Sequence, residues 1–424
     1  MKTSIATMPA TTPDSKTLAT TLKCLSQFQA RWGDDWPFIA DCQSLPSEDY
    51  QFVQREVPKL IATSSQPRAK MQDFVEKMTL GSSENPRQLA AYLSLLTYMA
   101  LAFRRPYVEK DPEKLAAMPV VSEESIQFPH KLSNLWTDVG KRLGIEASTS
   151  LTSLVYCNFS CELADLPYAE DPAIESENIV ALIAHQRSRY QSVVMHFCNH
   201  EDLGDRAIYK KFLKIFLYSE IAGKRVYRWA EKALSAYEEE QSPQHIVDCF
   251  RVMIQWAKEG LQQNLETGEI PAAALAIAQF TPAIKLAERR STPGVTGFFV
   301  PFLDEFFGFT SESSAYLERV RASHPFLLRE LADILVACQD DSPYLFIMEQ
   351  MPEPQRKQLE DLRTELWTVM KEWRTFHRNQ VGRFLSKGVV SQSQTPYTKG
   401  FLRNFVTNMN ERMRAFEQEG DRPS

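Results

Sequence analysis

The chain has 424 residues, of which 43% are hydrophobic and 24% charged, and its formal net charge is -6. This composition is typical of a globular protein that buries a sizeable core. The negative charge argues against nucleic-acid binding, which requires a basic surface. The longest apolar run, residues 89–103, contains polar residues and is too short to cross a bilayer. We therefore expect a buried helix there, and neither a nucleic-acid partner nor a membrane partner.

The first 21 residues and the cysteines give information about the cellular compartment of the protein. Residues 1–21 are rich in Thr, Ser, Ala and Pro and lack the continuous apolar core of a signal peptide, which predicts a flexible tail. The seven cysteines are scattered and form no C-x-x-C pair. This pattern favours reduced thiols in a cytoplasmic protein.

Apolar residues recur at helical spacing along most of the chain, and no alternating run is long enough for a sheet of any size. We expect an all-α fold. Residues 166–172, Leu-Pro-Tyr-Ala-Glu-Asp-Pro, have turn chemistry, so we place the boundary between a small helical domain (22–166) and a large one (167–424) there. The expected helices span residues 50–62, 69–78, 89–103, 128–143, 176–195, 209–236, 243–265, 271–290, 298–307, 314–337, 352–385 and 400–418.

One histidine lies on the apolar stripe of the helix expected over residues 352–385. His377 continues the stripe that contains Leu366, Trp373 and Phe376, and Arg374 lies one turn before it. An imidazole in an apolar setting needs a partner, and a metal ion is one. A haem offers iron to the histidine and a propionate to the arginine. The alternative is a core histidine bonded to a carbonyl, beside a surface arginine.

The other histidines are weaker candidates for a metal ligand. His196 and His200 have the four-residue spacing that can bind zinc on one helix face. Their polar neighbours indicate that the helix ends there, which favours surface or capping roles. The four others lie in peripheral settings: His130, His185, His245 and His324.

Residues 366–377, Leu-Trp-Thr-Val-Met-Lys-Glu-Trp-Arg-Thr-Phe-His, resemble the proximal-ligand helix of the indoleamine 2,3-dioxygenase family, which carries an Arg-x-x-His pattern. The resemblance extends to residues 301–308 (Pro-Phe-Leu-Asp-Glu-Phe-Phe-Gly), 315–321 (Ala-Tyr-Leu-Glu-Arg-Val-Arg), 143–145 (Leu-Gly-Ile) and 154–156 (Leu-Val-Tyr). It covers most of residues 68–420. It implies a large helical domain that encloses haem b, where dioxygen is inserted across the C2=C3 bond of tryptophan or another indole.

The resemblance also assigns roles to single residues. His377 matches the proximal iron ligand, and Arg374 matches the residue that binds a haem propionate. Asp304 matches an aspartate that supports this arginine, so an ion pair between Asp304 and Arg374 is expected. Phe212 and Tyr156 match residues near the substrate, although each is equally suited to a core position.

The chain departs from the family on the substrate side. Phe216 stands where the family has a distal serine, Ala274 replaces a phenylalanine, and Gln279 replaces the arginine that binds the substrate carboxylate. Residues 395–400, Thr-Pro-Tyr-Thr-Lys-Gly, replace a loop rich in glycine and threonine. Tryptophan affinity should suffer unless Arg289, Arg290 or Lys399 supplies the charge. The catalytic candidates are Phe212, Phe216 and Gln279, and the candidate substrate contacts are Tyr156, Phe212, Ala274, Gln279 and Thr398.

Other functions stay open on the sequence alone. A haem enzyme of the same superfamily with another outcome is one, as in the pyrrolnitrin-pathway enzyme that rearranges a halogenated tryptophan. A haem-free helical interaction protein is another, because a fold does not establish catalysis. A gas sensor or haem carrier is a third. The polar loop 387–399 is either a mobile lid or a simple connection.

Overall fold

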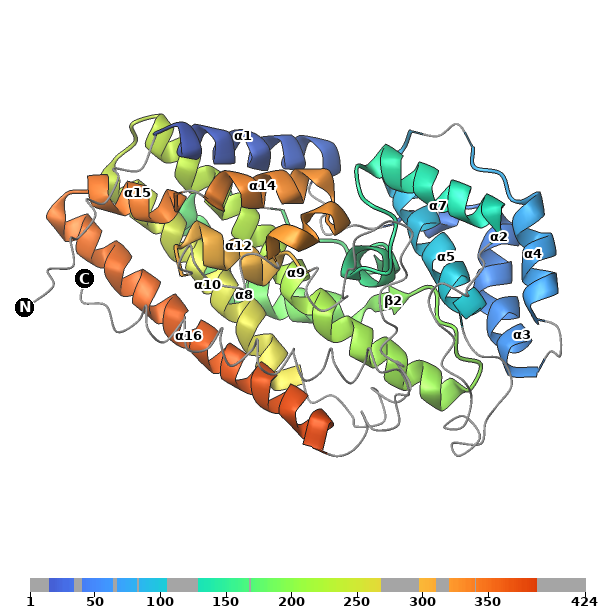
Figure 1. Ribbon diagram of the computed structural model, residues 1–424. Coiled ribbons are helices and arrows are strands. Elements are labelled where there is room, and N and C mark those ends of the chain that lie inside the picture. Colours follow the sequence, from blue (N-terminus) through green and yellow to red (C-terminus); the bar gives the residue numbers. More distant parts are fainter. Residues whose placement is uncertain are drawn as a thin grey trace, which may run out of the picture.

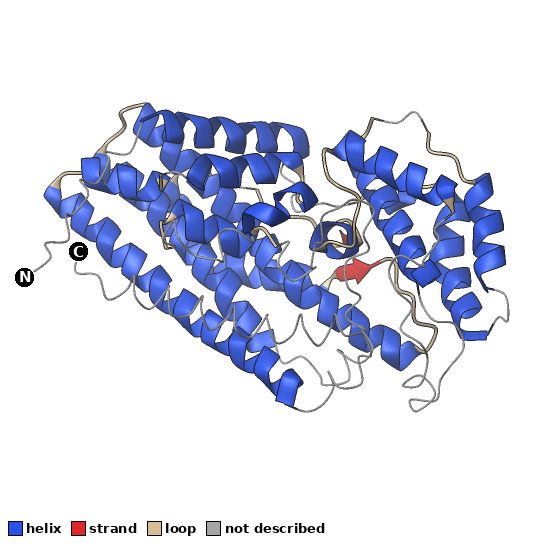
Figure 2. Cartoon of the chain, in the orientation of Figure 1, coloured by secondary structure: helices blue, strands red, loops and turns tan. Residues whose placement is uncertain are grey.

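A computed structural model shows that the chain is built almost entirely of helices, which confirms the all-α expectation (Figures 1 and 2). The structure describes residues 15–33, 40–63, 67–81, 84–104, 129–167, 169–267, 297–309, 320–339 and 341–386. Within these residues, the only sheet is a short antiparallel pair, in which β1 (Phe159–Cys161) pairs with β2 (Val193–Met195). All seven cysteines are free thiols.

One group of helices surrounds a central antiparallel pair, α9 (Leu203–Glu238) and α10 (Pro243–Thr267). The two helices pack along much of their length because both bury a wide apolar stripe, including Trp229 and Trp256. The helix α16 (Glu353–Ser386) covers α10, as Figure 1 shows. The other members are α1 (Ser15–Trp32), α8 (Pro172–Gln191), α12 (Phe299–Phe306), α14 (Arg329–Gln339), α15 (Pro343–Gln350) and α16 (Glu353–Ser386).

A second group lies at the right of Figure 1 around α5 (Pro86–Arg104), whose apolar run is buried on nearly all sides. This burial explains why the run is hydrophobic without being a membrane helix. The chain leaves the last helix of the group at Gly144, which has φ 73 and so forms a left-handed cap that favours glycine. The members are α2 (Ser47–Gln51), a π turn η3 (Phe52–Glu56), α3 (Val57–Thr63), α4 (Pro67–Lys77), α5 (Pro86–Arg104) and α7 (His130–Leu143).

The connection between the groups positions part of the candidate site. After α7, a π turn η5 (Thr152–Tyr156) packs against both α5 and α9. In the sequence β1 precedes α8 and β2 follows it. In the structure the two strands pair with each other, with Phe159 opposite Met195. The side chain of Asp171 caps α8 by accepting a 2.8 Å hydrogen bond from the Ala173 amide. The division into a small and a large domain stays a prediction.

The prediction of a flexible tail over residues 1–21 is wrong for its last residues. Residues 15–21 belong to α1 rather than to a flexible tail, and Leu18 and Thr21 are buried. The helix packs on α14 and α9, so residues 22–32 lie with the C-terminal helices rather than with α2–α7. Ser26 donates a 2.7 Å hydrogen bond to Glu231 of α9. The amphipathic pattern of α1 was therefore a packing signal.

Two other helices differ from expectation. The helix expected over residues 314–337 is interrupted by the turn η7 (His324–Phe326), because Pro325 lacks the amide hydrogen that a continuous helix needs. The helix α8 ends at Gln191, and the residues after it form β2. The helices expected over 271–290 and 400–418 lie outside the described residues. None of the helices that are described combines the length and apolarity that crossing a bilayer requires.

Candidate functional site

The apolar stripe of α16 changes character along the helix. Leu366 and Met370 are fully buried, whereas Trp373, Phe376 and His377 are only half-buried. The upstream part is covered by α10, which lies beside α16. Two polar contacts fix how the two helices align: Arg251 bonds Gln358 at 3.0 Å, and Lys258 pairs with Glu365 at 3.0 Å.

Both contacts join residues 107 positions apart, so α10 and α16 run parallel in a constant register. The same offset brings Thr267, the last residue of α10, opposite Arg374. The ring of His377 therefore lies about one turn beyond the end of α10. This position explains why burial falls at the C-terminal end of the stripe.

The expected ion pair between Asp304 and Arg374 is confirmed. Asp304 is completely buried on α12, and Arg374 is 8% exposed on α16. The other residues of the short helix α12 are mostly apolar, and buried side chains such as Phe302 and Phe306 fix it in the core. A buried guanidinium is tolerated only with a partner that offsets its lost hydration. The pair therefore fixes α12 to α16 immediately before His377.

The ring of His377 stacks on Trp373, the residue one turn earlier in α16. The two ring centroids are 5.2 Å apart and the planes differ by 4°. Side chains four residues apart lie on one helix face, which allows this contact. The indole therefore sets the plane of the imidazole on the same turn that carries Arg374.

The predicted substrate contact Tyr156 belongs to a second cluster, centred on Glu220 of α9. The Tyr156 hydroxyl donates a 2.9 Å hydrogen bond to Glu220 Oε1, which also accepts from the amides of Phe298 and Phe299 at 2.9 Å each. Tyr227 donates to Oε2 at 3.0 Å. This carboxylate therefore ties η5 and α9 to the start of α12.

Sequence reasoning did not identify Glu220. Its burial raises its pKa, and the four hydrogen bonds that it accepts oppose that shift. The signal in the sequence is a single carboxylate between the apolar residues Leu217 and Ile221, both of which are buried. A charged residue within an apolar stripe must find buried donors.

Phe212 and Phe216 lie on the same face of α9 as Glu220, two turns and one turn before it. Their rings contact each other edge to face at 5.2 Å between centroids. Phe212 is buried and Phe216 is half-buried. The remaining predicted substrate and catalytic residues lie outside the described residues: Ala274, Gln279 and Thr398, together with Arg289, Arg290, Lys399 and the loop 387–399.

The helix α12 connects the two clusters. Its first residues are bound by Glu220, and Asp304 near its end is bound to Arg374. The structure thus links Tyr156 to Arg374 through one short, buried helix. What the arrangement offers chemically is an imidazole and a guanidinium, both held in orientation, on the half-buried end of an otherwise apolar stripe.

The alternative zinc pair does not lie on a helix. His196 and His200 belong to the connection between β2 and α9, so the helical spacing argument does not apply to them. The Nδ1 atom of His196 lies 3.1 Å from the Tyr50 hydroxyl, and the ring of His200 packs against Tyr209. In the described part of the chain, no three His, Cys, Asp or Glu side chains gather closely enough to hold a metal ion.

The chain matches no protein-family model, and no curated protein matches it significantly.

Proposed function

We propose that this protein is a haem-dependent dioxygenase that inserts dioxygen into the indole ring of tryptophan or a related compound. The observation that carries the proposal is the buried ion pair between Asp304 and Arg374, one turn before the half-buried His377. The resemblance to the indoleamine 2,3-dioxygenase family anticipated this pair between residues 70 positions apart in the sequence.

The donor set of α16 fits a haem. His377 would hold the iron, and its plane is already set by Trp373. Arg374 would bind a propionate, because the planar guanidinium carries several donor hydrogens in an arrangement that suits a carboxylate. Bound haem would supply dioxygen binding and activation. Asp304 would keep the guanidinium in place when the haem binds.

Residues on α9 would form the apolar side of the site. Phe212 and Phe216 supply aromatic surface suited to an indole. Neither side chain can accept or donate a proton, which suits a reaction that needs no strong distal base. Tyr156 would act through Glu220 and α12, because its hydroxyl is bonded to that carboxylate.

The test is the absorption spectrum of the purified protein with added haem, before and after reduction with dithionite. We expect a Soret band that His377→Ala abolishes or shifts, whereas the control His130→Ala, at an exposed position on α7, leaves it unchanged. A His377→Ala protein with an unchanged spectrum would overturn the proposal. Wild-type protein that retains no haem after the excess has been removed would do the same, and would favour a haem-free interaction protein.

Product analysis then tests the reaction. Formylkynurenine formed from tryptophan by the reduced holoprotein is the expected result. Holoprotein that binds carbon monoxide but turns over no indole would instead indicate a sensor or carrier. A rearranged product from a halogenated tryptophan would indicate the other superfamily chemistry.

A further inference from the structure

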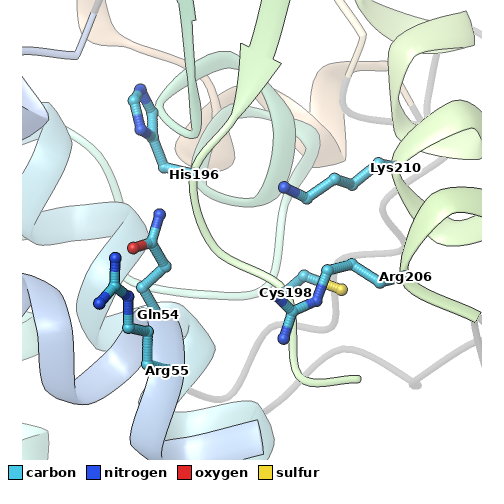
Figure 3. Close-up of a pocket in the computed structure, with 6 residues that line it drawn as sticks. All are labelled: Gln54, Arg55, His196, Cys198, Arg206 and Lys210. Carbon is cyan, nitrogen blue, oxygen red and sulfur yellow. The ribbon is translucent and has the colours of Figure 1, made fainter. Parts of the chain in front are cut away.

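A second site lies away from α16, in a cavity of about 240 Å³ between η3 and the first turns of α9. Figure 3 shows side chains of η3 on one side and those of α9 on the other, with the segment after β2 between them. The lining residues are Gln54, Arg55, His196, Cys198, Arg206 and Lys210. Three of them are cationic, and none of the six is a carboxylate.

The cations on α9 are held by backbone carbonyls. Lys210 Nζ donates to the Met195 carbonyl at 2.7 Å, and Arg206 donates to the His200 carbonyl from Nε at 3.1 Å and from Nη2 at 2.9 Å. Arg55 is exposed on η3. Within the described residues, none of these three cations forms an ion pair. Arg206 and Lys210 are also one helical turn apart, so their like charges repel each other.

Burial is the main influence on the pKa values of Lys210 and His196, and the neighbouring cations add a smaller contribution. Burial lowers the pKa of Lys210; Cys198 opposes this shift, and the charge of Arg206 adds to it. Burial also lowers the pKa of His196 to about 4, with a contribution from Lys210. His196 is therefore neutral near pH 7, and the charge in the cavity comes from the two arginines and the lysine. An anion between them would relieve their mutual repulsion.

We propose that this cavity binds a phosphate group, either free or on a small molecule. Three cations that approach from two separate elements suit an oxyanion with several acceptor oxygens. The volume is below that of a typical pocket for a drug-sized ligand, so the bound molecule is small. The anion would join η3, in the group of helices around α5, to α9. Its binding should therefore also raise the unfolding temperature.

The test is isothermal titration calorimetry with inorganic phosphate at constant ionic strength, using the full chain. We expect saturable binding that Arg55→Gln and Arg206→Gln each weaken about tenfold, the loss expected for one charge-assisted hydrogen bond. The control Lys211→Gln removes the same charge from an exposed neighbouring position on α9 that does not line the cavity, and should bind as the wild type does. Circular dichroism checks that each variant is folded.

A second titration with glycerol phosphate identifies the source of the anion. Glycerol phosphate that binds at least tenfold more tightly indicates a phosphorylated small molecule, and equal affinities indicate free phosphate. Heat changes that never saturate would overturn the proposal. It would also fail if Arg55→Gln, Arg206→Gln and Lys211→Gln weakened binding equally, because that result describes general charge attraction. The result is independent of whether the protein binds haem.

Discussion

Two carboxylates with largely buried side chains, Asp165 before α8 and Glu220 on α9, are satisfied in different ways. Asp165, whose side chain is 9% exposed, pairs with Lys224 at 2.8 Å and Arg189 at 3.0 Å, and a third cation, Arg225, lies 3.5 Å away. Glu220, 2% exposed, accepts hydrogen bonds only from neutral groups, namely two tyrosine hydroxyls and two backbone amides. Both carboxylates are largely removed from solvent, but their partners differ in charge.

The pKa values of the two groups move in opposite directions. Burial by itself raises the pKa of both carboxyls. At Asp165 the attraction of Lys224 and Arg189 outweighs burial and lowers the pKa, whereas at Glu220 the neutral donors do not. Full charges therefore hold the segment after β1 against α8 and α9, while neutral donors bind Glu220 and order the start of α12 without adding cations there.

The largest expected effect is the loss of stability in Asp165→Asn. Arg189, Lys224 and Arg225 would remain buried after losing the carboxylate that all three share, although Glu175 would still bond Arg225 at 2.6 Å. Removing one partner from a buried charge network costs about 3–5 kcal/mol. Urea unfolding at pH 7 measures this loss.

The matched control is Glu170→Gln, which breaks an exposed pair with Lys232. Such surface pairs contribute about 0–1 kcal/mol. If the two variants unfold at the same urea concentration, the cluster around Asp165 has no bracing role.

The next largest effect is the difference in stability between two variants of Glu220. In Glu220→Ala, two hydroxyls and two amides lose their buried acceptor, and we expect a loss of about 3 kcal/mol. In Glu220→Gln, the amide oxygen can replace Oε1, and the Tyr227 hydroxyl can turn to accept from the amide nitrogen. We expect this variant to lose less than about 1 kcal/mol. Equal losses would show that the negative charge, rather than the pattern of acceptors, is what the site requires.

Unfolding measured from pH 2 to 8 in the same variants sharpens the comparison. The lowered pKa of Asp165 means that its contribution is present above the unfolded pKa of about 3.9 and disappears as pH falls through the folded value. The raised pKa of Glu220 means that its contribution is greatest below about pH 4.3 and is lost as pH rises through the folded value. Relative to Glu220→Gln, the wild type should therefore become less stable as pH rises above that point.

Helical periodicity predicted most of the described helices, because each of them buries a stripe with the spacing that the sequence displays. The helical spacing of apolar residues failed as a predictor where a helix is very short or its apolar stripe is narrow. The helix α15 lies between Pro343 and Pro352 and has only eight residues, too few for a periodic signal. The helix α1 was missed because its polar composition hides a narrow stripe that contains Leu18 and Leu25.

The candidate site was predictable only in part. The pair of Asp304 and Arg374 came from resemblance, since no local pattern relates residues on two different helices. Glu220 was missed because its donors come from three segments, including backbone amides, and backbone donors leave no mark in a sequence. The cavity beside Lys210 was missed for a similar reason, because Arg55 approaches it from a distant helix.

The smallest effect tests the packing around Glu220 through Gly223, one turn along α9. Alanine in place of an interior helix glycine stabilises by about 0.5–1 kcal/mol when there is room. At Gly223 the added methyl would lie 2.6 Å from Tyr227 Oη and 2.8 Å from Phe299 Cδ2. Neither ring can move freely, because Tyr227 bonds Glu220 and Phe299 begins α12.

Overpacking a buried contact costs about 1–3 kcal/mol, so the clash should outweigh the helix preference and leave Gly223→Ala about 1 kcal/mol less stable. Gly204→Ala is the control, because it lies exposed at the start of α9, and the nearest atom to the new methyl is 3.1 Å away on the side chain of Asp202. Thermal unfolding should show a lower midpoint for Gly223→Ala only. A midpoint at or above that of the wild type would mean that the rings of Tyr227 and Phe299 are free to shift. The neutral donors around Glu220 would then be adaptable partners, in contrast to the fixed cations around Asp165.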